Sequence, residues 1–288
     1  MALVAPLLVV AAPLGGTAAG DARGGDPSCF GEPATITGTP GADRINGTAG
    51  DDIIVSGGGF DVVHGLGGDD KVCTGRGGDH LFGESGNDRL SGGRDGRRPD
   101  DDVVTSDVLD GGRGNDRING GPGLSANRPG VGDLAVYRDA PAAVQLSLTS
   151  DIAESGQYTD RLVSIEDATG TAQADVLTGD VRPNDLEGLA GQDELFGGDA
   201  FDRLGGGAGN DLAVSGDQYD IVFGDSGDDV LRSGRGPDEV YGEEGQDRLY
   251  GEEGDDRLYG EDGRDMADGG RHNRFDYCRA EVIVDCER

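Results

Sequence analysis

Aliphatic side chains recur in this chain at every ninth residue, separated by polar residues and glycine. Counted from Gly38, the first units are GTPGADRIN, GTAGDDIIV, SGGGFDVVH, GLGGDDKVC, TGRGGDHLF and GESGNDRLS. Their eighth positions are Ile45, Ile54, Val63, Val72, Leu81 and Leu90. A fixed internal period of this kind predicts a repeat architecture in which each small unit stacks on its neighbours.

The pattern is interrupted and then resumes. Residues 92–106 break the phase, one further unit (GGRGNDRIN) follows, and a second block holds register over eleven units. The eighth positions of that block are Leu177, Leu186, Leu195, Leu204, Ala213, Val222, Leu231, Val240, Leu249, Leu258 and Ala267. Between the blocks, 134–137 and 144–148 alternate as strands do. We interpret 125–165 as degenerate coils or a bulging loop, with a separate binding site as the alternative.

The sixth position of the unit carries the candidate chemistry. Seventeen of the eighteen units have Asp there, and Asn184 is the exception. Turn chemistry alone would let Asn, Ser or Gly replace many of them. The seventeen are Asp43, Asp52, Asp61, Asp70, Asp79, Asp88, Asp116, Asp175, Asp193, Asp202, Asp211, Asp220, Asp229, Asp238, Asp247, Asp256 and Asp265.

These units resemble the G-G-x-G-x-D-x-U-x nonapeptides of RTX proteins, the haemolysin-type calcium-binding repeats. The resemblance covers about residues 38–124 and 166–270. The opening CFGEPATITGTPGADRI also looks like secreted actinobacterial members of the family. The resemblance implies an all-β, right-handed parallel β-roll in two repeat blocks. Six residues of each unit form a turn, three form a strand, and two units make one coil.

The resemblance also implies several bound Ca²⁺ ions, with the seventeen aspartates as metal ligands. Glycines at the first and fourth positions, such as Gly47 and Gly50, are expected to adopt backbone angles that a Cβ would forbid. They would let carbonyl oxygens point inward beside the sixth-position carboxylate. A cage made only of oxygens suits Ca²⁺, which takes 6–8 oxygen ligands.

Stacking makes the metal necessary. With eighteen residues per coil, Asp43 and Asp61 lie on one edge and Asp52 and Asp70 on the other, about 4.8 Å apart in successive strands. Two carboxylates at that spacing repel by about 1 kcal/mol in water and roughly 3.5 kcal/mol at an effective dielectric of 20. Calcium shared between coils would turn these repulsions into attractions. We therefore expect the chain to fold on binding Ca²⁺.

Composition agrees with this reading. The chain has 288 residues, of which 56 are Gly, against about 20 expected from average usage. Its net charge of −33 excludes nucleic acid as a partner. Such a composition is typical of a disordered, self-repelling chain unless its carboxylates are ligands for a cation that cancels the repulsion.

The chain start and the cysteines predict export. No charged residue occurs in the first 20, and 2–14 is an apolar run too short to span a membrane. We predict a signal peptide (1–22), a secreted, extracellular protein and no membrane span; a buried apolar segment is the alternative. Four cysteines in an exported chain suggest disulfides with three possible pairings. Closeness in sequence favours Cys278–Cys286, which leaves Cys29–Cys73.

The predicted order of parts is an N-terminal cap (23–37), a first repeat block (38–124, with the insertion at 92–106), the connecting segment (125–165), a second block (166–270) and a C-terminal disulfide cap (271–288). No HExxH motif occurs, and GESG (83–86) and GDSG (224–227) fall short of GxSxG. Enzymes of the family carry a separate catalytic domain before the repeats, whereas only 21–37 precedes them here.

The sequence thus predicts a non-enzymatic, calcium-binding extracellular protein. The alternative is a secreted enzyme acting on polysaccharide, with its site in 125–165 or on the face of the roll. Tyr241 and Tyr259 hold the same position in successive coils and should stack, which packing explains and a sugar-binding platform would also require. Cell-surface or matrix glycans are therefore a candidate partner besides calcium ions.

Overall fold

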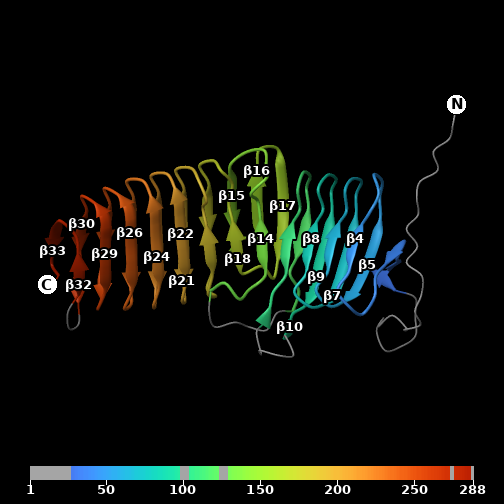
Figure 1. Cartoon of the computed structure of the whole chain (residues 1–288), viewed down its shortest axis with the longest axis horizontal. Coiled ribbons are helices and arrows are strands. Elements are labelled where there is room, and N and C mark those ends of the chain that lie inside the picture. The colour runs from blue at the N-terminus through green and yellow to red at the C-terminus, as the bar shows by residue number, and fades with distance from the viewer. Residues whose placement is uncertain (1–26, 98–103, 123–128, 273–275, 287–288) are drawn as a thin grey trace.

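A computed structural model describes residues 27–97, 104–122, 129–272 and 276–286. It shows an elongated solenoid of β-strands that begins at β1 and finishes at β33, at opposite ends of the molecule (Figure 1). The predicted signal peptide (1–22) lies outside the described residues. Within the described part no helix is long and apolar enough to cross a membrane.

One face of the solenoid is a parallel sheet of twelve strands, which we call the first sheet. Its strands follow one another in chain order along the long axis (Figure 1). They are β4 (Arg44–Asn46), β6 (Val62–His64), β8 (His80–Phe82), β12 (Val108–Asp110), β14 (Leu134–Val136), β18 (Asp167–Thr169), β20 (Asp185–Glu187), β22 (Arg203–Ala208), β24 (Ile221–Ser226), β26 (Glu239–Gly245), β29 (Arg257–Gly263) and β32 (Tyr277–Arg279).

The opposite face, the second sheet, alternates with the first along the chain. Its parallel strands are β3 (Ile36–Thr37), β5 (Ile53–Gly58), β7 (Lys71–Arg76), β9 (Arg89–Arg94), β13 (Arg117–Asn119), β19 (Val176–Thr178), β21 (Glu194–Asp199), β23 (Leu212–Asp217), β25 (Val230–Arg235), β27 (Arg248–Tyr250), β28 (Glu253–Gly254), β30 (Met266–Asp268), β31 (Arg271–His272) and β33 (Val282–Val284). In the regular coils, each residue pairs with the residue eighteen positions later, as Leu212 does with Val230. Two nonapeptides therefore make one coil, and the predicted parallel β-roll is confirmed.

The strands are longer than three residues in many coils. β25 covers positions seven to nine of one unit and the first three of the next, and Gly216 pairs with Gly234 within this extension. Glycines at the second position of the unit, such as Gly216 (φ 122°) and Gly234 (φ 97°), adopt the positive φ angles that this extension contains. The ladder of backbone hydrogen bonds therefore reaches into the turns that carry the aspartates.

The core is the single column of aliphatic residues expected from the nine-residue period. The eighth-position side chains are nearly all completely buried, and Ile45 in the first coil is the most exposed of them at 9%. The two sheets contribute alternate members to one continuous cluster. Its thinnest points are Ala135, Ala168, Ala213 and Ala267, because each fills the place of a larger aliphatic residue.

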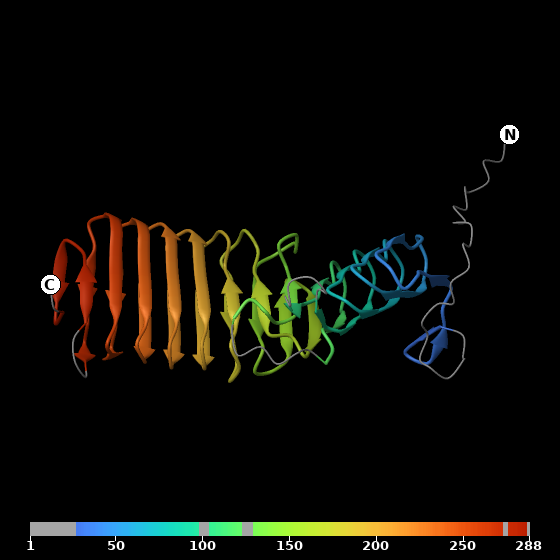
Figure 2. The same ribbon diagram turned by 60° about the horizontal axis from the view of Figure 1, so that its bottom comes forward.

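Two interruptions leave the roll near its middle. Residues 96–97 (β10, Gly96–Arg97) pair in antiparallel fashion with β11 (Val104–Thr105). The connecting segment supplies β14 to the first sheet, and β15 (Val144–Ser147), β16 (Ile152–Ser155) and β17 (Tyr158–Val163) to the second. β16 is antiparallel to both neighbours, so this meander bridges β13 and β19. Figure 2 shows the strands of the first third inclined to those of the second half.

A disulfide closes each end of the roll, and both predicted pairings are confirmed. Cys29–Cys73 ties β1 (Ser28–Cys29), which pairs with β2 (Glu32–Pro33), to β7. Cys278–Cys286 joins β32 to the residues after β33. The described residues contain no free cysteine. The terminal coils, which lack a neighbour on one side, are thus held by covalent bonds.

The structure corrects the expected role of the first-position glycines, while most fourth-position glycines adopt positive φ as expected. Of the two examples, neither Gly47 nor Gly50 adopts a left-handed backbone angle. In most later units the left-handed positions are the second and the fourth, as for Glu243 (φ 73°) and Gly245 (φ 156°). The first-position glycine is needed for a different reason, which is the space beside the aspartate.

Candidate metal centre

The predicted aspartates form two ladders along the edges of the roll. Sixteen of the seventeen are buried, with side chains at most 7% exposed, and Asp43 in the first coil is half-buried. The first ladder precedes the strands of the first sheet, and the second ladder precedes those of the second sheet. The predicted alternation is confirmed, because Asp43 and Asp61 share the first ladder while Asp52 and Asp70 share the second.

We call each aspartate of a ladder a rung. One repeated hydrogen bond fixes the position of each rung. The Oδ1 atom of an aspartate accepts the backbone N–H of the aspartate one coil earlier, at 2.7–3.0 Å. Asp229, for example, accepts from Asp211 (2.7 Å) and donates its own N–H to Asp247 (2.9 Å). This bond satisfies the backbone at the turn and aligns the carboxylates in a row.

In most rungs the other carboxylate oxygen has no such partner. The exceptions are Asp43, Asp52 and Asp175, whose Oδ2 atoms accept the backbone N–H of Thr39, Thr48 and Thr171. Among the described residues, no hydrogen-bond donor reaches the buried Oδ2 atom in a long series of rungs. A buried, unsatisfied carboxylate oxygen is costly, and such atoms in a native fold point to a bound cation or water. The series comprises Asp61, Asp70, Asp79, Asp88, Asp116, Asp193, Asp202, Asp211, Asp220, Asp229, Asp238, Asp247, Asp256 and Asp265.

The first-position glycine leaves room beside this oxygen. A Cβ on Gly206 would lie 2.7 Å from Asp211 Oδ2 and 2.9 Å from the carbonyl oxygen of Gly224, one coil later. The same two kinds of oxygen surround the equivalent glycines Gly188 and Gly251. Carboxylate and carbonyl oxygens from successive coils therefore converge on a space that any side chain would fill.

Burial also raises the pKa values of most ladder aspartates, because it disfavours the charged carboxylate. Burial, together with the charges of Asp211 and Asp247 and partly offset by the backbone hydrogen bond from Asp211, raises the pKa of Asp229 to about 7. Burial likewise raises the pKa of Asp202 and of Asp256 to about 8. The fold thus holds its carboxylates where ionisation is unfavourable without a cation.

The ladder residues fit calcium. The donors are oxygens only, whereas all four cysteines are in disulfides. Ca²⁺ accepts carboxylate and carbonyl oxygens in flexible geometry, while zinc prefers nitrogen and sulfur. Aspartates of successive coils, with carbonyls of the first-position residues, would hold the ions, and each ion would supply the positive charge that the buried ladder lacks.

The structure adds four aspartates to the ladders that counting in units of nine residues missed. Asp107, Asp133, Asp160 and Asp276 accept the same backbone hydrogen bond as the predicted aspartates, at 2.7–2.9 Å. Each is followed two residues later by a buried apolar side chain: Leu109, Ala135, Leu162 and Cys278. The triplet Asp-x-apolar, read without a fixed period, would have identified all four.

Glutamates replace aspartate where the ladders meet an interruption or an end. Asp133 donates its N–H to Glu166 Oε2 (3.1 Å), and Asp265 donates to Glu281 Oε2 (2.8 Å). Asp265 is the last aspartate of the second ladder, and Glu281 follows it with a longer side chain that reaches the same place.

Fold and ladders define a class: a parallel β-solenoid whose turns hold rows of buried carboxylates suited to cations. Comparison with family models narrows this class. The model for the RTX calcium-binding nonapeptide repeat (four copies) matches residues 35–63, 64–96, 105–123, 169–204, 205–240 and 241–273. These matches cover more than half of the chain, which therefore belongs to this family of calcium-binding repeats. A search of curated proteins finds no match.

Proposed function

We propose that this protein is a secreted, non-enzymatic calcium-binding module whose roll folds when Ca²⁺ occupies the two ladders. The seventeen predicted aspartates, with the added rungs, are the proposed ligands. The observation that carries the proposal is the row of buried Oδ2 atoms without hydrogen-bond donors, most of them beside a space kept open by a first-position glycine. Family membership supports the choice of calcium.

A calcium titration followed by circular dichroism tests the proposal. We expect a disordered spectrum in EDTA at neutral pH and a strand spectrum at millimolar Ca²⁺, because extracellular calcium modules have dissociation constants of about 10⁻⁴–10⁻³ M. Mg²⁺ is the control and should not substitute, since it demands octahedral geometry and shorter bonds. A strand spectrum that is unchanged by EDTA would refute folding on binding.

Export is supported by the two disulfides, which form and persist in oxidising compartments. The uncharged apolar run at residues 2–14 and the family membership point the same way. Intact-mass analysis of the culture supernatant should find a chain cleaved near residue 22 with four oxidised thiols. A chain retaining Met1 with four free thiols would contradict the proposed route.

The aromatic ladder gives little support to a glycan partner. Tyr241 stacks on Tyr259 (4.9 Å between ring centroids, 9° between planes) as the sequence predicted, and on Phe223 (5.2 Å, 11°). Their faces therefore cover one another and mainly ring edges remain outside. Sugar stacking needs a free aromatic face, so we assign these rings to packing along the sheet.

A second candidate, an enzyme acting on polysaccharide, is favoured by one cavity of about 340 Å³ on the first sheet. It is lined in part by Asp167, Asp185, Glu187 and Arg203, and burial raises the pKa of Asp167 to about 7, near that of a general acid. However, Asp167 accepts backbone N–H groups, and Arg203 pairs with Asp185 and Glu187.

These contacts give the cavity carboxylates structural partners, so the calcium module is the better-supported function. Release of reducing ends from neutral and acidic polysaccharides distinguishes the two. The enzyme hypothesis predicts an activity that Asp167→Asn abolishes. The calcium module predicts no release by either protein.

A further inference from the structure

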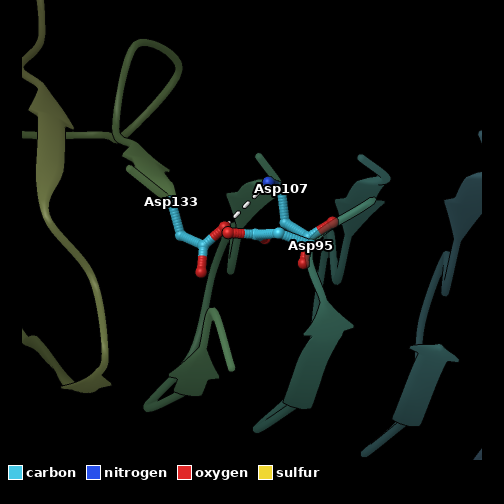
Figure 3. Close-up of side chains that lie close together, drawn as sticks. All are labelled: Asp95, Asp107 and Asp133. Atoms are coloured by element: carbon cyan, nitrogen blue, oxygen red, sulfur yellow. Dashed lines mark hydrogen bonds between the residues drawn. The ribbon is translucent and has the colours of Figure 1, made fainter. Parts of the chain in front are cut away.

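One site in the first ladder differs from all the regular rungs. Asp95, Asp107 and Asp133 each offer a carboxylate oxygen, and these oxygens lie within 4.8 Å of one another. Figure 3 shows the three side chains gathered at one point of the roll, with the Asp107 backbone nitrogen donating to the Asp133 carboxylate (2.8 Å). Asp107 and Asp133 are ladder rungs in successive coils, whereas Asp95 comes from a turn.

Asp95 holds a position at which the repeat has no carboxylate. The coil keeps its register through Arg94, whose carbonyl accepts the N–H of Gly77 as the Arg76 carbonyl accepts that of Gly59. Gly59 and Gly77 are fourth-position glycines, so Asp95 is the fourth residue of its own unit. The inserted hairpin begins directly after it, and the unit resumes at Asp107.

The cluster is buried and incompletely satisfied. The side chains of Asp95, Asp107 and Asp133 are 7%, 0% and 1% exposed. Among the described residues no hydrogen-bond donor reaches Oδ2 of Asp107 or of Asp133. These oxygens also lie against the spaces left by Gly92 and Gly120, the first-position glycines of the two interrupted units. Unsatisfied oxygens therefore point into a glycine-lined space that a third carboxylate borders.

We propose that Asp95, Asp107 and Asp133 form a distinct divalent-cation site that binds Ca²⁺ more tightly than the regular rungs. Ca²⁺ lies 2.3–2.6 Å from its ligands, so two oxygens on one ion are at most about 5 Å apart. The observed 4.8 Å limit meets this condition. Calcium affinity rises with the number of charged ligands, and this site has one carboxylate more than a pair of successive rungs supplies.

The site also has a structural reason to exist. Two interruptions of the first ladder lie here, between Asp95 and Asp107 and between Gly120 and Asp133. Insertion inside a turn removes part of the regular calcium cage, and a carboxylate at the fourth position compensates for those ligands. The bound ion would hold two irregular coils in line and so join the first repeats to the rest of the roll.

The test rests on the proposed calcium binding and compares three variants of the full chain by equilibrium dialysis against buffered Ca²⁺. Asp95→Gly restores the residue typical of the repeat, and Asp95→Asn keeps the size while removing the charge. Asp139→Asn is the control, because Asp139 is an exposed carboxylate that follows β14 and lies outside both ladders.

The wild type and Asp139→Asn should bind one ion at least about tenfold more tightly than the remaining ions. Both Asp95 variants should lose that one tight ion and keep the others, with an unchanged strand spectrum at saturating Ca²⁺. Isotherms of the Asp95 variants that superimpose on the wild type would overturn the tight site while leaving the calcium module intact. Absence of calcium binding by the wild type would overturn both.

Should Asp95→Gly not fold, Asp95→Asn alone decides, since it preserves the shape of the side chain. Loss of the tight ion in this variant, with the other ions retained, supports the site. Retention of the tight ion contradicts it.

Discussion

At the scale of the residue, each aspartate does two separable things. Its Oδ1 atom accepts the backbone N–H of the aspartate one coil earlier, while in most units its Oδ2 atom faces the space beside a first-position glycine. Asn184 is held differently: its Oδ1 accepts the N–H of Asp180 in its own turn, and its amide donates to the Glu166 carbonyl of the previous coil. A neutral amide can thus hold a turn by other bonds, so a carboxylate at nearly every other rung indicates the second task, cation binding.

Asp229→Asn separates these tasks in the middle of the second ladder. The amide oxygen can still accept from Asp211, but one charged ligand is lost from the spaces on both sides. We expect the calcium midpoint of folding to rise about tenfold, equivalent to about 1.4 kcal/mol. Asp228→Asn is the matched control, because Asp228 is the exposed neighbour. Equal midpoints for the two variants would show that Asp229 only shapes its turn.

The Gly206→Ala variant tests whether the space beside Asp211 must stay open, and it leaves the charge of the ladder unchanged. The added Cβ would lie within 3 Å of both Asp211 Oδ2 and the Gly224 carbonyl, so it should crowd the ion and cost about 1–3 kcal/mol. Gly50→Ala is the control, since a Cβ there meets nothing within 4 Å. Thermal unfolding in saturating Ca²⁺ measures both. A Gly206 variant as stable as the Gly50 variant would contradict a glycine-lined site.

At the scale of the element, the sequence predicts the regular coils far better than the irregular ones. Two features follow directly from the nine-residue period, because each unit contacts only its neighbours. They are the stacked core and the alternation of the aspartates between the two edges of the roll. Asp107 and Asp160 were missed because insertions shift the count without changing the local Asp-x-apolar triplet. Asp95 and Glu281 could not be predicted, because their roles depend on where an interrupted chain re-enters the roll.

A disulfide holds the coils at each end of the roll, and the two disulfides should stabilise the fold by different amounts. Cys29–Cys73 spans 44 residues and Cys278–Cys286 spans 8. The loop-entropy relation gives about 4 kcal/mol for the longer loop and roughly 2.6 kcal/mol for the shorter. Replacing Cys29 and Cys73 by Ser should therefore lower the unfolding temperature in calcium more than replacing Cys278 and Cys286. The reverse order would show that local packing of the caps dominates over loop length.

At the scale of the whole molecule, the net charge is −33, and many of the acidic side chains lie along two buried rows. Burial raises the pKa of these carboxylates, for example to about 6 for Asp79 and to about 8 for Asp116. The metal-free roll therefore binds more protons than the unfolded chain, in which an aspartate has a pKa near 3.8. Protons and calcium compete for the same oxygens, and either can neutralise the ladders.

Because the metal-free roll binds more protons than the unfolded chain, its stability should fall as the pH rises. Without metal, the protonated ladders stabilise the roll below about pH 4, and that stability is lost as the pH rises through about 6–8, the folded-state pKa values of most rungs. In EDTA, the strand signal in circular dichroism should therefore fall between pH 4 and pH 8. In saturating Ca²⁺ it should persist to pH 8. A signal in EDTA that increases with pH would contradict the burial of ionisable ladders.

The most direct test of the central claim is a crystal structure grown from calcium, with an anomalous difference map to locate the ions. We predict two rows of peaks along the edges of the roll, each about 2.3–2.6 Å from aspartate Oδ2 atoms and first-position carbonyls. A well-ordered roll grown in millimolar Ca²⁺ with no anomalous density along either ladder would contradict the account.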